Sequence, residues 1–560
     1  MGSLSDSTRD LGLQYPLAFR DESVVDDYHG VSIADPYRWL EDPDAKQVKE
    51  FVEKQASLTE SVLKTCETRE DLRRTIERLF DNPRFSTPFK KGNKYFYFHN
   101  SGLQAHDVLY VQDSLEEEAE VLLDPNGLSE DGTVALNMMS ISEDAKYIAY
   151  GLSSRGSDWV TVKVMRVDDK AAESDCLSWV KFSSINWTHD GKGFFYCRYP
   201  APKEGNDLDA GTETNIYLNH EVRYHFLGTD QSEDILCWRD PDHPKWTFGA
   251  QVTDDGKYLL LYINEGCDPV EKLYYCDLSA LENGLEGFRE RSNMLPFIKL
   301  VDNFDACYGY VANDESEFTF LTNKDAPKYK LVRVNIKEPE EWVDVVPQSK
   351  RDVLKSAEAV NGNQVLVSYL SDVKCELESG VPEMKIFREI VVPGFDRTAF
   401  EVRQVFASSK DGTKIPMFVV SKKDIQLDNS HPSLLFGYGG FNVTITPSFS
   451  VARLVLMRHL GIVFCIANIR GGGEYGEEWH KAGSLSKKQN CFDDFIASAE
   501  YLVSSGYTRP DKLCIEGGSN GGLLVAACIN QIFTTSQCEK AMGRDCQSDP
   551  PIPLYNVVDG

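Results

Sequence analysis

Residues 512–531, KLCIEGGSNGGLLVAACINQ, combine a short apolar strand, a glycine-rich turn and an apolar helix. The turn matches the pattern G-x-S-x-G, with Ser519 between Gly517 and Gly521. In a nucleophile elbow the chain passes so sharply from strand to helix that larger side chains beside the serine would clash, and glycines avoid this clash. The pattern alone is common, but the strand before it and the helix after it favour an elbow that exposes the Ser519 hydroxyl.

A serine nucleophile also needs hydrogen-bond donors for the negative charge that grows on the carbonyl oxygen of its substrate. The backbone N–H of Asn520, directly after the serine, is the first candidate donor. The second is expected in a glycine-rich loop after an earlier strand, where FGYGGFN stands at residues 436–442. Tyr438 is the side chain of this loop best placed to donate, and a hairpin turn with a packed tyrosine is the alternative.

Around these two motifs, apolar strands alternate with helices and glycine loops from about residue 401 to residue 531. Residues 490–506 carry their apolar side chains on one helical face, with Asn490 able to cap the start and Gly506 able to end the helix. Strands that alternate with helices form a parallel sheet covered by helices. We therefore expect an α/β domain here.

Residues 76–400 instead show short alternating strands rich in Tyr, Phe, Val and Thr between Gly and Asp turns. A loose repeat places an acidic or glycine turn before an aromatic strand, as in SEDAKYIAYGLS, THDGKGFFYCRY and TDDGKYLLLYIN. This spacing suits a β-propeller with one four-stranded sheet in each blade of roughly 40–50 residues. A large irregular sandwich is the alternative. Residues 1–75, which precede this region, are expected to form an N-terminal helical segment.

The charge and the cysteines restrict the class of protein. Lys and Arg number 59 and Asp and Glu number 88, which gives a net charge of −29. This charge opposes attraction to nucleic acid or to an anionic membrane, so neither is expected as a partner. The N-terminus lacks the apolar run of a signal peptide, and the fourteen cysteines include no C-x-x-C pair. Free thiols in a cytoplasmic protein are expected.

Two further patterns resemble binding motifs without their context. Residues 471–476, GGGEYG, match G-x-G-x-x-G, but Asp493 is predicted at the start of a helix, whereas a dinucleotide site needs its acid at the end of a strand. HEVRYH, from His220 to His225, is one residue too long for the zinc-binding H-E-x-x-H. We therefore expect no metal and no cofactor.

Taken together, several motifs resemble the prolyl oligopeptidase family, cytosolic serine peptidases that cut short peptides after proline. They include DPYRWLEDPD, GTDQSEDILC, GCDPV, SKDGTKIPMFVV, GYGGFN, NIRGGGEYG and GGSNGGLLVAAC, and the resemblance runs from about Tyr15 to Gln531. It implies an α/β-hydrolase domain joined to an all-β, seven-bladed propeller. It also implies that the N-terminal helical segment packs against the hydrolase domain.

The resemblance also assigns roles to single residues. Ser519 is the nucleophile, and Tyr438 and the Asn520 N–H form the oxyanion hole. Phe441 helps to line a proline pocket, and Cys267 of GCDPV faces the substrate cavity. The implied partners are short proline-containing peptides, and the protein is expected to be a monomer. Whether water or a peptide amine resolves the acyl-enzyme stays open, so both hydrolysis and transpeptidation are possible outcomes.

Two departures from the family pattern stand out. Only residues 375–381, CELESGV, separate SYLSDVK from PEMKIFREIVV. The resemblance implies roughly 40 more residues here, about one blade, so a shortened last blade is expected. From about Ile532 the resemblance stops, and residues 532–560 are expected to be a non-family tail that leaves the α/β-hydrolase domain incomplete at its C-terminus.

The family keeps its triad Asp and His in the part that this tail replaces, and none of the 41 residues after Ser519 is a histidine. His431, His459 and His480 could serve as the base only in an unrelated geometry. One interpretation is a serine-type oligopeptidase that acts through an acyl-enzyme on Ser519. The second is a catalytically inactive form with residual peptide binding through Phe441 and the propeller cavity. A non-enzymatic propeller scaffold ranks third, because it leaves the elbow without a purpose.

Overall fold

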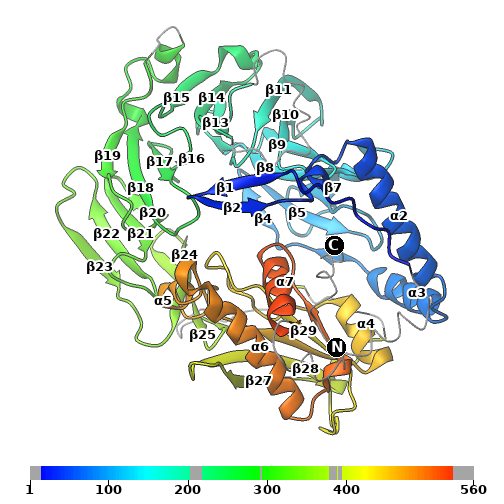
Figure 1. The fold of residues 1–560 in the computed structure, drawn as a ribbon. Helices are drawn as coiled ribbons and strands as arrows, with labels where there is room; N and C mark the ends of the chain where they lie inside the picture. The colour runs from blue at the N-terminus through cyan, green and yellow to red at the C-terminus, as the bar shows by residue number, and fades with distance from the viewer. Residues whose placement is uncertain are drawn as a thin grey trace.

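The computed structural model describes residues 14–201, 217–289, 293–377, 387–388, 392 and 394–533. Figure 1 shows a ring of β-sheets in cyan to green, an α/β domain in yellow to red, and the N-terminal helices α2 (Lys46–Leu63) and α3 (Arg69–Phe80) in blue. An N-terminal hairpin of β1 (Val25–Tyr28) and β2 (Val31–Ala34) precedes the helices. Within these ranges no helix is long and apolar enough to cross a lipid bilayer.

The ring is a β-propeller whose sheets are built from strands that are consecutive in the sequence. The first sheet contains β3 (Arg84–Phe85), β4 (Phe89–Lys91), β5 (Lys94–Asn100), β6 (Val108–Gln112) and β7 (Glu120–Leu123); the second contains β8 (Val134–Ile141), β9 (Tyr147–Ser154), β10 (Val160–Arg166) and β11 (Ala172–Val180); the third contains β12 (Asn186–Trp187), β13 (Gly193–Arg198), β14 (Glu221–Phe226) and β15 (Ile235–Trp238). The fourth contains β16 (Thr247–Val252), β17 (Tyr258–Asn264), β18 (Glu271–Asp277) and β19 (Ile298–Val301); the fifth contains β20 (Tyr308–Asp314), β21 (Glu317–Thr322), β22 (Lys330–Asn335) and β23 (Trp342–Val346); the sixth contains β24 (Val353–Val360), β25 (Gln364–Ser371) and β26 (Lys374–Leu377).

The propeller prediction is confirmed, but the described residues form six sheets and not the seven expected. β26 ends at Leu377, and β27, the first strand of the α/β domain, begins at Phe400. A further four-stranded blade needs about 40–50 residues, which this interval cannot hold. The sixth sheet has three strands within the described residues, and most of the short segment 375–381 lies outside them.

A propeller sheet that lies between two other sheets is buried on both of its faces. Strand β17, YLLLYIN, shows the effect. Leu259 and Leu261 pack towards the third sheet, whereas Tyr258 and Leu260 pack towards the fifth. Successive side chains of a strand point to opposite faces, so a nearly continuous apolar sequence is required here. Each fully buried leucine contributes about 1.5–3 kcal/mol of hydrophobic stabilisation.

The α/β domain is built on a mixed five-stranded sheet with the order β27-β28-β30-β29-β31. Its strands are β27 (Phe400–Ser408), β28 (Lys414–Lys422), β29 (Ser433–Gly437), β30 (Val463–Ala467) and β31 (Leu513–Glu516), and its helices are α4 (Val451–Leu460), α5 (Glu477–Lys481), α6 (Lys488–Ser504) and α7 (Asn520–Phe533). β29 is parallel to β30 and to β31, whereas β28 is antiparallel to β27 and to β30. The expectation of a purely parallel sheet is therefore wrong, because β27 and β28 form a hairpin at one side.

The start of helix α6 differs from the sequence-based expectation. Helix α6 begins at Lys488 without a side-chain cap, and Asn490 lies inside its first turn, where its Nδ2 donates to the Ala482 carbonyl at 2.9 Å. Gly506 does follow the helix in a left-handed conformation, with a φ of 83°.

Of the described strands, β31 stands at one edge of the sheet and pairs only with β29. The proposed tail from residue 532 lies outside the described residues except for the last turn of α7.

The N-terminal segment packs on the α/β domain through α3. Leu72, Ile76 and Leu79 form one apolar stripe along this helix, and they contact Val451 and Val455 of α4. The spacing of the three residues by three or four positions places them on one helical face. Helix α3 therefore packs directly against α4 of the α/β domain (Figure 1).

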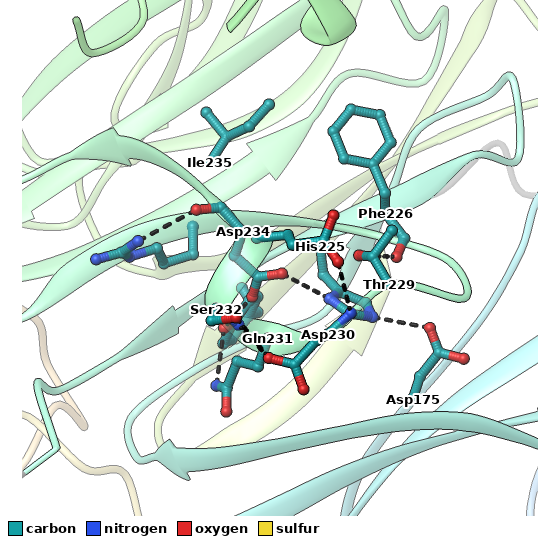
Figure 2. Close-up of polar contacts among 12 residues, drawn as sticks. Asp175, His225, Phe226, Thr229, Asp230, Gln231, Ser232, Asp234 and Ile235 are labelled. Carbon is teal, nitrogen blue, oxygen red and sulfur yellow. Dashed lines mark hydrogen bonds and ion pairs between the residues drawn. The ribbon is translucent and has the colours of Figure 1, made fainter. Parts of the chain in front are cut away.

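A buried histidine joins the second and third propeller sheets (Figure 2). His225 of β14 places Nε2 2.8 Å from Asp175 Oδ1 of β11 and Nδ1 2.7 Å from Oδ1 of Asp234, just before β15. The three side chains have no exposed surface. Because both ring nitrogens face carboxylate oxygens, His225 is an imidazolium that donates from both nitrogens. In the sequence, His225 stands out only as the last residue of HEVRYH, which is one residue too long for a zinc motif.

The charge of His225 depends on two opposing effects. Burial by itself lowers the pKa of the imidazole, but the hydrogen bonds and charges of Asp175 and Asp234 outweigh this effect and raise the pKa to about 9. Asp234 is held in turn by the Tyr196 hydroxyl, which donates to its Oδ2 at 2.5 Å. Asp175 Oδ1 accepts the Gly228 N–H at 2.7 Å. The imidazolium therefore holds two adjacent blades together in a buried, charged hydrogen-bond network.

We expect this network to make stability fall at alkaline pH. The folded pKa of His225, about 9, lies above its ordinary value of 6.5, so the contribution is complete below about pH 6.5 and is lost as the pH rises through about 9. The difference between the two pKa values corresponds to roughly 3 kcal/mol. Urea unfolding of the chain and of His225→Gln, measured from pH 6 to pH 10, should show a stability difference that is largest at pH 6. A difference that does not change with pH would contradict the imidazolium.

Candidate active site

Ser519 lies in the tight turn between β31 and α7. Its φ is 53°, in the left-handed region that residues other than glycine rarely adopt. Only Gly517, Gly518 and Ser519 connect the end of β31 to the first residue of α7, and Ser519 is exposed. A strained, exposed serine between a parallel strand and the helix that follows it is the geometry of a nucleophile elbow.

The two glycines of the motif are required by close backbone contacts. A Cβ atom on Gly517 would lie 2.3 Å from the Gly521 carbonyl oxygen, and one on Gly521 would lie 2.6 Å from the Gly437 carbonyl oxygen. A Cβ atom on Gly518, by contrast, would meet nothing within 4 Å. The predicted need for small residues on both sides of Ser519 thus has a specific cause. The elbow packs against itself and against the end of β29.

The loop after β29 packs directly on the elbow. Asn520 Nδ2 donates to the Tyr438 carbonyl at 2.5 Å, and a Cβ atom on Gly440 would lie 2.4 Å from the same amide nitrogen. Lys488 Nζ donates to the Gly439 carbonyl at 2.8 Å and lies 3.4 Å from Asn520 Oδ1. These contacts place the two predicted oxyanion-hole residues, Tyr438 and Asn520, side by side. The N–H of Asn520 opens α7, where the first N–H groups lack acceptors within the helix.

The same loop has an unusual backbone. Gly439, Phe441 and Asn442 have φ values of 61°, 54° and 57°, all left-handed. A hairpin turn is excluded, because β29 pairs in parallel with both of its neighbours and the chain continues to α4. The Phe441 side chain is 55% exposed, so it is available to a ligand. Cys267, the other predicted ligand contact, is an exposed thiol between β17 and β18 of the fourth propeller sheet.

Within the described residues, no histidine or carboxylate hydrogen-bonds the Ser519 hydroxyl. His480 of α5 is buried, and its Nδ1 lies 2.7 Å from the Gly471 carbonyl oxygen. His459 is an exposed residue near the end of α4. His431 precedes β29, whereas Tyr438 follows it, so the whole strand separates this histidine from the site loop.

A buried arginine behind the site was missed by the sequence analysis. Arg470 follows β30, and its Nε and Nη2 donate to the Asp494 carboxylate of α6 at 2.9 and 2.6 Å. Its Nη1 donates to Asp411 at 2.5 Å, and the Ser409 hydroxyl donates to Asp494 at 2.6 Å. Such a bidentate, charge-assisted pair fixes the loop 471–476 against α6. Asp493 lies in helix α6, as expected, and not at the end of a strand.

Comparison with known proteins places this site in a family. The family model described as the prolyl oligopeptidase N-terminal beta-propeller domain matches residues 16–402, and the model described as the prolyl oligopeptidase family matches residues 447–537. Prolyl oligopeptidase A of Amanita bisporigera is 35% identical over 595 residues, which cover 92% of this chain and 77% of the relative. The chain belongs to the prolyl oligopeptidase family.

Solved structures of this family agree with the fold. Prolyl oligopeptidase B of Galerina marginata bound to a 25mer macrocyclization substrate superposes with a TM-score of 0.84 at 32% identity, over 92% of this chain and 80% of that one. The apo structure of the same relative gives a TM-score of 0.66 at 31% identity, over 92% and 81% of the two chains. The present structure is thus more similar to the substrate-bound form than to the apo form.

We expect the elbow glycines to tolerate no side chain. Gly517→Ala or Gly521→Ala should destabilise the chain by about 1–3 kcal/mol, because backbone atoms would have to move. For Gly521 this loss would oppose the higher helix propensity of alanine in α7. Gly518→Ala is the matched control and should change stability by less than about 0.5 kcal/mol. Urea unfolding of the three variants measures the difference, and equal stabilities would contradict the close packing of the elbow.

Proposed function

We propose that this chain is a serine-type oligopeptidase in which Ser519 attacks short peptides on the C-terminal side of proline. The observation that carries the proposal is the left-handed φ of 53° at Ser519, held between two glycines that cannot carry a side chain. Strain of this kind persists only where the surrounding structure enforces it, and it is concentrated at functional sites. Membership of the prolyl oligopeptidase family supplies the substrate class.

In the proposed reaction, the Ser519 oxygen bonds to the carbonyl carbon of the proline residue while its proton passes to a base. The C–N bond to the next residue then breaks, the amine leaves with the proton, and an acyl-enzyme remains on Ser519. Water or a peptide amine resolves this ester, which gives hydrolysis or transpeptidation. The Tyr438 hydroxyl and the Asn520 N–H would stabilise the oxyanion, each by roughly 3–4 kcal/mol.

Substrate binding is assigned to two surfaces. Phe441, exposed beside the elbow, would contact the proline ring, because an aromatic face packs well on a flat apolar ring. Cys267 would face the peptide from the propeller, whose ring admits only short, flexible chains. We assign residues 1–75 to an N-terminal segment that packs with the hydrolase domain, 76–400 to the propeller, 401–531 to the α/β-hydrolase domain and 532–560 to a non-family tail. The packing of α3 on α4 supports the first of these assignments.

A second candidate function is peptide binding without turnover. It is favoured by the absence of a histidine at the Ser519 hydroxyl among the described residues. A serine hydroxyl without a base is a weak nucleophile, although the oxyanion donors and the binding surface would remain. In this candidate the elbow and the loop 438–442 bind a proline-containing peptide, and the acyl-enzyme does not form.

A reporter assay distinguishes the two candidates. The second candidate predicts that the purified 560-residue chain cleaves a fluorogenic Gly-Pro peptide no faster than its Ser519→Ala variant, because within the described residues no histidine or carboxylate hydrogen-bonds the Ser519 hydroxyl. Fluorescence anisotropy of a labelled, uncleavable peptide on both proteins measures the binding that remains. Ser519-dependent turnover above about 1 s⁻¹, within the usual enzyme range, would establish the peptidase and exclude the second candidate.

The roles of Ser519 and Tyr438 can be tested in a chimera that carries the C-terminal segment and last blade of prolyl oligopeptidase A of Amanita bisporigera. We expect it to cleave after proline, Ser519→Ala to abolish cleavage, and Tyr438→Phe to lower kcat by roughly 10²–10³-fold. Tyr475→Phe, which removes a tyrosine hydroxyl away from the elbow, is the control. An unchanged kcat for Tyr438→Phe would remove the oxyanion assignment while leaving the nucleophile in place.

A further inference from the structure

The propeller and the α/β domain meet at a buried glutamate. Glu477 is the first residue of α5 and is 3% exposed. Its backbone N–H donates to the Pro327 carbonyl at 2.8 Å, and its Oε1 accepts the Tyr329 hydroxyl at 2.8 Å. Pro327 and Tyr329 lie between β21 and β22 of the fifth propeller sheet. A Cβ atom on Gly476 would lie 2.3 Å from the Pro327 carbonyl oxygen, so the start of α5 is in direct contact with the propeller.

The same carboxylate also holds the loop of the candidate site. Glu477 Oε1 accepts Asn442 Nδ2 at 2.8 Å, and this amide nitrogen lies 3.3 Å from the Tyr329 hydroxyl. Tyr329 and Asn442 are the two side chains that hydrogen-bond the Glu477 carboxylate within the described residues. The other carboxylate oxygen, Oε2, is buried and has no partner there. One oxygen atom therefore joins a propeller side chain to the end of the loop 438–442.

The direction of these hydrogen bonds is fixed by the chemistry of the groups. Burial, together with nearby Cys307 and Glu477, raises the pKa of Tyr329 far above its ordinary value, so its hydroxyl keeps its proton and donates. An amide nitrogen can only donate, and a carboxylate accepts from both. Hydrogen bonds to a charged acceptor are about twice as strong as those between neutral groups.

The hydrogen bond from Asn442 to Glu477 holds a part of the loop whose backbone is strained. Phe441 and Asn442 are consecutive left-handed residues, a conformation whose cost the surrounding contacts must offset. Asparagine adopts this conformation more readily than a bulky residue such as Phe441 does. The Asn442 N–H donates to the Gly471 carbonyl oxygen at 3.3 Å. Within the described residues, the Asn442 side chain donates to Glu477 Oε1 and makes one longer contact, to the Tyr329 hydroxyl.

We propose that Glu477 is a positioning residue through which Tyr329 of the propeller sets the conformation of the loop 438–442. When Tyr329 is present, its hydroxyl and the Asn442 amide both donate to Glu477 Oε1, and the Tyr329 side chain keeps water away from this oxygen. Without it, water competes with the Asn442 amide for Glu477, and the left-handed turn at Phe441 loses one of its supports. The role of this loop in peptide binding rests on the proposed function. The dependence of the loop conformation on Tyr329 does not rest on that function.

Hydrogen–deuterium exchange of the 560-residue chain tests the proposal without requiring activity. Tyr329→Phe should speed the exchange of the Asn442 and Val443 amides about tenfold, the effect of losing one charge-assisted hydrogen bond. Tyr475→Phe is the matched control, because its hydroxyl also crosses between the domains, to Asp372 Oδ1 at 3.4 Å, but does not touch the loop. The control should leave these amides unchanged.

Two further variants separate positioning from general destabilisation. Glu477→Ala should increase the same exchange at least as much as Tyr329→Phe, whereas Glu477→Gln should restore most of the protection, because an amide oxygen accepts both hydrogen bonds. The unfolding midpoint of Tyr329→Phe should match that of Tyr475→Phe. In the same proteins, Tyr329→Phe should weaken binding of a labelled Gly-Pro peptide about tenfold, with no change for Tyr475→Phe.

Equal exchange in Tyr329→Phe and Tyr475→Phe, or no rescue by Glu477→Gln, would overturn the positioning role whatever Ser519 does. Faster exchange of the loop with unchanged peptide affinity would uphold the positioning role and would count against Phe441 as a peptide contact. A chain that binds no peptide even when unsubstituted, but shows the exchange pattern, would uphold the link to Tyr329 and contradict the proposed function.

Discussion

The candidate site depends on how closely the loop after β29 approaches the turn after β31. The two strands are adjacent and parallel, so their carboxyl ends meet at the same edge of the sheet. Side-chain volume would limit the contact between the two turns, and the glycines at 440, 517 and 521 remove that limit. A larger residue at 517 or 521 would approach the Gly437 carbonyl oxygen too closely and would push the elbow away from the loop that carries Tyr438.

Buried hydrogen bonds of charged side chains join neighbouring elements in both domains. Arg470 ties the loop after β30 to α6, and Glu477 ties the start of α5 to the propeller. His225 does the same between two blades. Breaking the Arg470–Asp494 pair or the pairs of His225 with Asp175 and Asp234 would leave an uncompensated buried charge, which costs several kcal/mol, so these ion pairs strongly favour one arrangement of their neighbours. The hydrophobic clusters supply stability, and these polar contacts determine which elements meet.

Much of this architecture was predictable from local patterns. The change from aromatic alternating strands to apolar strands and helices near residue 400 marks the transition between the propeller and the α/β domain, and it follows from the two different periods of strand and helix. The elbow was predictable because G-x-S-x-G, its strand and its helix are contiguous in the sequence. The N-terminal boundary of α6 was not, because Asn490 hydrogen-bonds a neighbouring loop, an interaction that local capping preferences do not contain.

By itself, the sequence determined the class of each domain, the position of Ser519 and the loop that would approach it, because those features depend on residues close together along the chain. Only the tertiary structure decided the number of propeller sheets, the antiparallel hairpin at the side of the α/β sheet, and the partners of His225, Arg470 and Glu477. Asp175 and His225 are 50 residues apart, and Tyr329 and Glu477 are 148 apart. Contacts over such separations are set by the packing of whole sheets against each other, and no periodicity or short motif in the sequence encodes them.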